Sequence, residues 1–121
     1  MDERIEKAFE TANYMATLSN QRRIILEEFN QQLIYYINGA VFKIDSNLIT
    51  YVKTVLDLGH TTDVVFVDSN NSPVQIQDVQ EFFNAVTEQY FLALNSYSNK
   101  YTEIKKQRRI QGLIELWTAE Q

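Results

Sequence analysis

Residues that interrupt helices are confined to the middle of this 121-residue chain. The single proline and two of the three glycines lie between residues 39 and 73, whereas residues 2–38 and 78–120 are rich in helix-forming side chains. We therefore predict an α+β fold. Two long antiparallel, coiled-coil-like helices flank a small insert, residues 40–76, which contains one short helix and a three-stranded sheet.

Composition indicates a folded protein and limits the classes of partner that it can bind. An apolar content of 45% and a charged content of 22% fit a single domain that spans residues 1–121. A net charge of −5 disfavours nucleic acid as a partner, because phosphate binding needs concentrated Lys and Arg. The chain has no cysteine, which excludes disulfides, thiolate chemistry and sulfur-ligated metal centres.

The ends and the hydropathy of the chain bear on its location. The charged start Met-Asp-Glu-Arg is not that of a secretory signal, and no stretch approaches 18 consecutive apolar residues. We expect no membrane-spanning segment and no membrane partner.

The first long helix carries an apolar stripe with alternating three- and four-residue spacing. Its members are Ile5, Ala8, Ala12, Met15, Leu26, Phe29, Leu33 and Tyr36. Ser19 and Arg22 occupy the intervening positions of this heptad. Either they are polar seam residues that set register, or the buried stripe drifts toward Leu18 and Ile25, as a straight helix slips against a strict heptad. Gly39 is predicted to end the helix at a position that takes a positive φ.

The insert reads as strand, helix, strand, turn, strand. Residues 40–45 alternate as a strand, and Ser46 is the expected N-cap of a short helix that ends at Gly59. Residues 63–68 contain the continuously apolar, β-prone run Val64-Val65-Phe66-Val67, and the turn-rich segment 69–73 predicts a hairpin with residues 74–76. The crossover favours a three-stranded mixed sheet covered by the short helix, and an antiparallel arrangement is the alternative.

The last helix begins with a clear signal and ends with a second apolar patch. Asp78 followed by Glu81 is a carboxylate variant of the capping box. The apolar stripe runs to Ile104, crosses the polar residues 105–109 and resumes in Ile110, Leu113, Ile114 and Trp117. This second patch needs a covering partner, and residues 5–15 of the first helix supply one if the helices run antiparallel.

Residues that could carry catalysis or bind a metal are sparse. His60 has Asp57 and Asp63 three residues away on either side, but an exposed loop histidine is the better interpretation. Residues 68–72 superficially resemble a calcium loop, yet the required sixth-position glycine is replaced by Pro73. No phosphate-binding glycine loop or nucleophile motif is present. We expect no enzyme, no cofactor and no metal site.

Interaction surfaces are the stronger hypothesis. The candidate interaction residues lie on the last helix: Tyr97, Tyr101, Ile110, Leu113, Ile114 and Trp117. Ordinary packing between the two helices, with Tyr14, Tyr35 and Tyr36 on the first, explains the tyrosines equally well. The basic residues Arg22-Arg23 and Lys105 to Arg109 allow an alternative function, a small regulator that binds host machinery or nucleic acid.

Several segments resemble small proteins of tailed phages, especially contractile-tailed phages of cyanobacteria. They are Phe42 with Leu48-Ile49-Thr50-Tyr51-Val52, Val65-Phe66-Val67-Asp68, Pro73-Val74-Gln75-Ile76, Tyr90, Tyr97, Tyr101 and Lys105-Lys106-Gln107-Arg108. The resemblance covers about residues 40–109 and implies a virion structural component or assembly factor. Its partners would be copies of itself, as a homo-oligomer, and other virion or assembly proteins, in the host cytoplasm or the virion. The layout is also similar to prefoldin-type chaperones, in which two helices form an antiparallel coiled coil, although the short helix between strands departs from that family.

Overall fold

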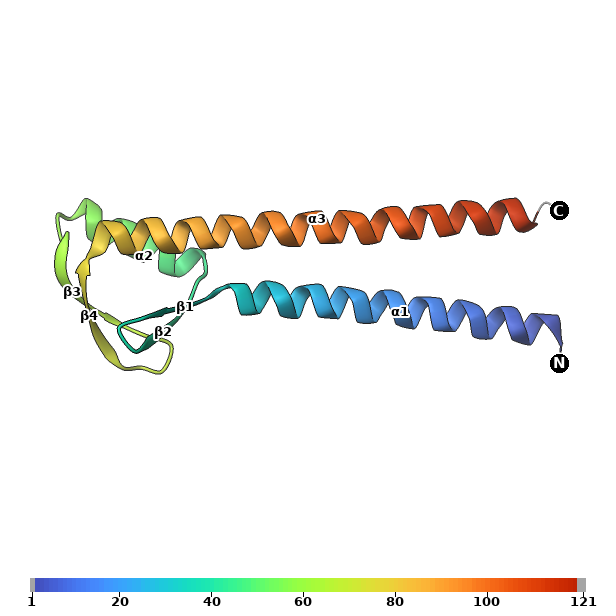
Figure 1. The fold of residues 1–121 in the computed structure, drawn as a ribbon, viewed down its shortest axis with the longest axis horizontal. Coiled ribbons are helices and arrows are strands. Elements are labelled where there is room, and N and C mark those ends of the chain that lie inside the picture. The colour runs from blue at the N-terminus through green and yellow to red at the C-terminus, as the bar shows by residue number, and fades with distance from the viewer. Residues whose placement is uncertain (1, 120–121) are drawn as a thin grey trace. The chain divides into compact units, whose positions relative to one another are not determined.

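The computed structural model describes residues 2–119, and it describes side chains as far as Ile114. The elements in chain order are α1 (Glu3–Gln32), β1 (Ile34–Ile37), β2 (Ala40–Lys43), α2 (Ser46–Asp57), β3 (Thr62–Val67), β4 (Pro73–Asp78) and α3 (Val79–Ala119), as labelled in Figure 1. The predicted α+β fold, with a long helix at each end and a small α/β insert, is confirmed. None of the described helices is both long enough and apolar enough to cross a membrane.

The chain divides into two compact units. Unit 1 combines residues 1–28 with residues 96–121, so within the described chain it consists of most of α1 and the second half of α3. Unit 2 is residues 29–95, which include the end of α1, both hairpins, α2 and the first half of α3.

The first hairpin corrects the predicted end of the first helix. The helix was expected to reach Asn38, but α1 ends at Gln32 and residues 34–37 form β1, antiparallel to β2. Asn38 and Gly39 form the two-residue turn, with φ values of 51° and 78°. An Asn-Gly turn with two positive φ values matches the twist of a hairpin, and the β-branched and aromatic residues of β1 suit a strand. Tyr35 and Tyr36 therefore belong to a strand, not to a helix.

The strands form two separate two-stranded antiparallel sheets, so the predicted three-stranded mixed sheet is wrong. The hairpin of β3 and β4 is as expected, with Phe66 opposite Val74 and Val67 opposite Pro73. β2 pairs with β1 on one edge. On its other edge β2 is hydrogen-bonded to the loop between β3 and β4 instead of to a third strand. The backbone oxygen of Val41 accepts a hydrogen bond from Ser69 N at 2.8 Å, and Lys43 N donates to Ser69 Oγ at 2.9 Å.

Asp68 is the buried carboxylate of this loop, at 7% exposure. Its Oδ1 accepts hydrogen bonds from Ser72 N at 2.8 Å and Asn70 N at 3.0 Å, and its Oδ2 accepts one from Val41 N at 3.1 Å. These donors, first that of Ser72, lower the pKa of Asp68 below its usual value of 3.8, against the opposing effect of burial. One side chain therefore shapes the β3–β4 turn and fastens it to the first hairpin.

The helix ends in unit 2 follow capping rules. The N-cap of α2 is Asp45 rather than the expected Ser46, because the Asp45 side chain accepts a hydrogen bond from Leu48 N at 2.7 Å. Gly59 ends α2 as predicted: it takes a φ of 90°, Gly59 N donates to Leu56 O, and His60 N donates to Val55 O. Asp78 caps α3 as predicted, through a bond from Glu81 N at 3.0 Å.

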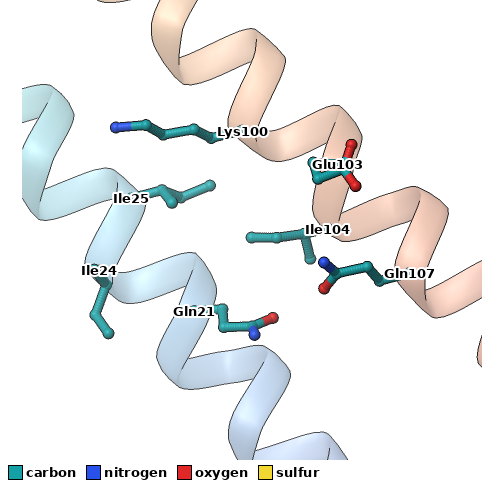
Figure 2. A pocket seen from close by; sticks show the side chains of 7 residues that line it. All are labelled: Gln21, Ile24, Ile25, Lys100, Glu103, Ile104 and Gln107. Carbon is teal, nitrogen blue, oxygen red and sulfur yellow. The ribbon is translucent and has the colours of Figure 1, made fainter.

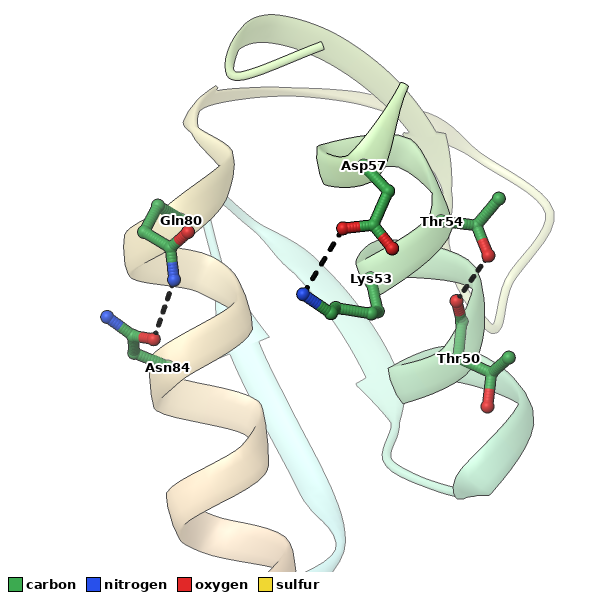
Figure 3. A network of polar contacts seen from close by, with 6 residues as sticks. All are labelled: Thr50, Lys53, Thr54, Asp57, Gln80 and Asn84. Carbon is green, nitrogen blue, oxygen red and sulfur yellow. Dashed lines mark hydrogen bonds and ion pairs between the residues drawn. The ribbon is translucent and has the colours of Figure 1, made fainter. Parts of the chain in front are cut away.

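The core of unit 2 is built around Phe82 on α3, which is 1% exposed. Its ring lies 5.1 Å from that of Phe42, 5.5 Å from that of Phe66 and 5.9 Å from that of Tyr35. Both hairpins thus pack on the same aromatic side chain. On the helix surfaces outside this core, contacts such as Lys53 to Asp57 and Gln80 to Asn84 join residues of a single helix (Figure 3).

Candidate interaction surface

The inner side of unit 1 is narrow and only partly apolar. Leu18 on α1 and Ile104 on α3 are buried, at 5% and 7% exposure, and Ile25 is half-buried. Glu28 on α1 forms an ion pair with Lys100 on α3 at 2.5 Å. Antiparallel helices in unit 1 are therefore held by few buried side chains.

The position of Leu18 decides between the two interpretations of the first helix. Leu18 and Ile25 face α3, whereas Met15, Ser19 and Leu26 of the predicted heptad are exposed. The buried stripe has drifted off the strict heptad, as the second interpretation predicted. The heptad positions Met15, Ser19 and Leu26 consequently lie exposed beside the buried stripe, whereas Arg22 contacts Tyr101 of α3.

An open groove runs along one side of the helix pair in unit 1. It encloses about 240 Å³ and is lined by Gln21, Ile24, Ile25, Lys100, Glu103, Ile104 and Gln107 (Figure 2). Drug-sized ligands occupy clefts of about 300–1,000 Å³ that bury most of their surface. This groove is smaller and open, and its isoleucines and long polar side chains fit a protein surface better than a small molecule.

The two predicted tyrosines lie together in unit 1. The rings of Tyr97 and Tyr101 are 6.1 Å apart, and both residues are half-buried. Tyr101 also contacts two cations: the guanidinium of Arg22 lies 6.0 Å from its ring centroid and the ammonium of Lys105 lies 5.0 Å from it. The tyrosines therefore serve the packing between the helices, and basic residues distant in sequence meet at Tyr101.

The predicted apolar patch near the end of α3 is exposed. Ile110, Leu113 and Ile114 are half or more exposed, while the side chain of Trp117 lies outside the part that the structure describes. Ile5 and Met15 on α1, expected to cover this patch, are also exposed. The two apolar patches of unit 1 thus do not bury one another.

Sequence reasoning chose only residues of α3 and missed the matching residues of α1. Up to Ile114, where the described side chains end, eight large apolar side chains of unit 1 are 46–62% exposed, namely Ile5, Phe9, Met15, Ile24, Leu26, Ile110, Leu113 and Ile114. The signal for part of the α1 set was its own heptad, which was taken for an internal seam. A heptad pattern on one helix fits packing against a helix of another chain as well as packing within the same chain.

The candidate catalytic and metal-binding residues do not form a site. His60 is exposed, and the Asp57 carboxylate is engaged with Lys53 at 3.2 Å. Among residues 2–114, no group of three or more His, Asp and Glu side chains is placed to hold a metal ion. Residues 68–72 use their oxygen acceptors for the turn around Asp68, as the hairpin interpretation predicted.

Comparison of the chain with protein-family models, with curated proteins and with solved structures found no significant match.

Proposed function

We propose that this protein is a non-enzymatic protein–protein interaction module that acts as an oligomer. We further propose that it is a structural or assembly component of a tailed phage, with other virion or assembly proteins as partners, in the host cytoplasm or the virion. The phage assignment rests on the sequence resemblance of residues 40–109. The interaction role rests on the side chains of unit 1.

The observation that carries the interaction role is an imbalance between buried and exposed apolar side chains. Among the side chains of unit 1 that the structure describes, two large aliphatic ones are buried, Leu18 and Ile104, and eight large apolar ones are about half exposed. Unit 2 has a core of twelve buried residues around Phe82. Exposed apolar surface on this scale marks interaction sites in soluble proteins, and here it is distributed over both helices of unit 1.

Burial of these side chains against another chain is energetically sufficient for association. Complete burial of a large apolar side chain contributes about 1.5–3 kcal/mol, so the exposed half of each contributes about 1 kcal/mol. Eight of them supply on the order of 10 kcal/mol per chain, comparable with the roughly 4–15 kcal/mol that association costs. Contacts that bury these side chains on both partners therefore offset the cost of association.

Light scattering on the purified protein at micromolar concentration tests the proposal, together with a pull-down on virion proteins. We expect a mass above that of the monomer. The double variant Ile110→Glu, Leu113→Glu should weaken association on the order of tenfold or more, because it places charge in an apolar contact. Leu92→Glu, which changes an equally exposed leucine of the same helix in unit 2, is the matched control. A monomer that binds no virion protein would contradict the proposal.

A second candidate function uses the basic residues. Arg22 and Lys105 come from segments far apart in sequence and contact the same ring, that of Tyr101. This arrangement supports a regulator that binds host machinery or nucleic acid there. Such binding should fall steeply with added salt and be abolished by charge reversal of Lys105 and Arg108. Absence of binding to single- or double-stranded nucleic acid at low salt removes the nucleic-acid form of this idea.

A further inference from the structure

The helix pair of unit 1 has two sides that differ in their contacts. On one side lies the groove, with Ile24 on α1 and with Lys100, Glu103 and Gln107 on α3 (Figure 2). On the other side Arg22 and Lys105 approach the ring of Tyr101. We call these the groove side and the basic side. Positions three, four or seven residues apart share one side of a helix, which assigns the remaining side chains.

The groove side is acidic. Glu3, Glu6 and Glu10 follow one another at spacings of three and four residues on the part of α1 that precedes Gln21, and they lie on the same side of the helix. Glu103 on α3 adds a fourth carboxylate and lines the groove. The same spacings place Lys7 and Lys106 near this side, and Lys100 is neutralised by its ion pair with Glu28. With Glu28 included, the carboxylates of the groove side still outnumber its lysines.

The basic side carries cations from both helices. Arg4 lies about five helical turns before Arg22 on the same side of α1. Arg109 lies one turn beyond Lys105 on α3. The carboxylates of unit 1 whose side chains the structure describes fall on the groove side or on the outer edges of the pair. The two sides of unit 1 thus carry net charges of opposite sign.

Each side also carries exposed apolar side chains. Met15 and Leu26 lie seven residues before and four residues after Arg22, which places them on the basic side. Ile24 lines the groove, and Ile110, seven residues after Glu103, extends the groove side along α3. Both sides therefore combine an apolar centre with charge, and the charges are opposite in sign.

We propose that a second copy of this chain binds head to tail: the basic side of one helix pair packs on the groove side of the next. This inference rests on the proposed function and specifies its partner and contact. A two-fold symmetric contact would bring identical sides together, cation against cation or carboxylate against carboxylate, whereas the head-to-tail contact brings opposite charges together. Every copy offers one side of each kind, so the contact repeats from copy to copy.

Two single-side variants test this geometry by light scattering. Met15→Glu blocks the basic side, Ile110→Glu blocks the groove side, and Ala16→Glu, at an exposed position on the outer edge of α1, is the matched control. We expect the wild type and the control to form species larger than a dimer as concentration rises. Each blocked variant alone should stay monomeric, and an equimolar mixture should form a 1:1 pair and nothing larger, because one intact side remains on each variant. Circular dichroism checks that helix content is retained, and raising the salt from about 50 to 500 mM should weaken the wild-type association because the charges are exposed.

Other outcomes separate the failure of this inference from that of the proposed function. A wild-type dimer that only one of the two variants disrupts indicates two-fold pairing and overturns the head-to-tail contact. A wild-type monomer that captures a defined virion protein overturns the self-contact and leaves the interaction role in place. A wild-type monomer that binds no virion protein contradicts both.

Discussion

At the scale of single residues, Asp68 has the largest structural role of any polar side chain in unit 2. It accepts three backbone hydrogen bonds from two separate hairpins while it is almost completely buried. An ionised carboxylate accepts such bonds more strongly than an amide, and removal of a partner leaves buried donors unsatisfied. The tie between the two hairpins should therefore depend on the charge of this residue.

Asp68→Asn should lower the stability of the protein at neutral pH and change its pH dependence. The folded-state pKa of Asp68 lies below its usual value of 3.8, so its stabilisation is fully present above about pH 4 and is lost as pH falls through the folded-state pKa. Urea unfolding midpoints measured between pH 7 and pH 2 should fall less steeply in acid for the variant than for the wild type. Asp57→Asn, at an exposed carboxylate, is the control. Parallel acid profiles for wild type and Asp68→Asn would contradict the assignment.

At the scale of elements, the sequence predicted those whose signals are local. The cap at Asp78, the end of α2 at Gly59 and the hairpin of β3 and β4 each depend on side chains within a few residues, and each is present. The first hairpin was missed because the apolar stripe of α1 continues through residues 33–37 in a pattern that also suits a helix. The Asn38-Gly39 pair, which favours a two-residue hairpin turn, distinguishes a strand at residues 34–37 from a continuing helix, but Gly39 was interpreted as the end of a helix.

The N-cap of α2 provides a prediction at the scale of the element. Asp45→Ala should destabilise the protein by about 1 kcal/mol, within roughly 0.5–2 kcal/mol, because it removes the acceptor for Leu48 N. Ser46→Ala, one residue later, should change the unfolding free energy by less than about 0.5 kcal/mol. Denaturant unfolding of the two variants decides which residue caps the helix. An equal or larger effect of Ser46→Ala would identify the serine as the cap.

At the scale of the whole molecule, the two units differ in what stabilises them. Unit 2 has its own core, and unit 1 has a thin line of contacts between two helices. The sequence indicated the apolar patch at residues 110–117 but gave its partner as residues 5–15, because periodicity shows that a helix has an apolar side and not which way that side points. The exposure of the side chains themselves, on α1 and on α3, shows that the two patches do not cover one another.

Native-state hydrogen exchange should reveal this difference along α3. Backbone amides of residues 82–95 should be strongly protected, and those of residues 98–114 should exchange faster at low protein concentration, because few buried side chains hold that part of the helix. Protection of residues 98–114 should increase with protein concentration, since association covers their exposed side chains. Uniform protection along the helix at all concentrations would contradict this description.

The hydrogen bonds of Asp68 also bear on the order in which unit 2 folds. Its bonds to Asn70 and Ser72 span two and four residues, whereas its bond to Val41 spans 27. Closure of short loops takes tens of nanoseconds, so the turn can orient the carboxylate before the more distant hairpin reaches it. A φ-value near one for Asp68→Asn fits early formation of the turn, and a value near zero contradicts it. In that order of events, the first hairpin docks on an acceptor whose geometry is already set.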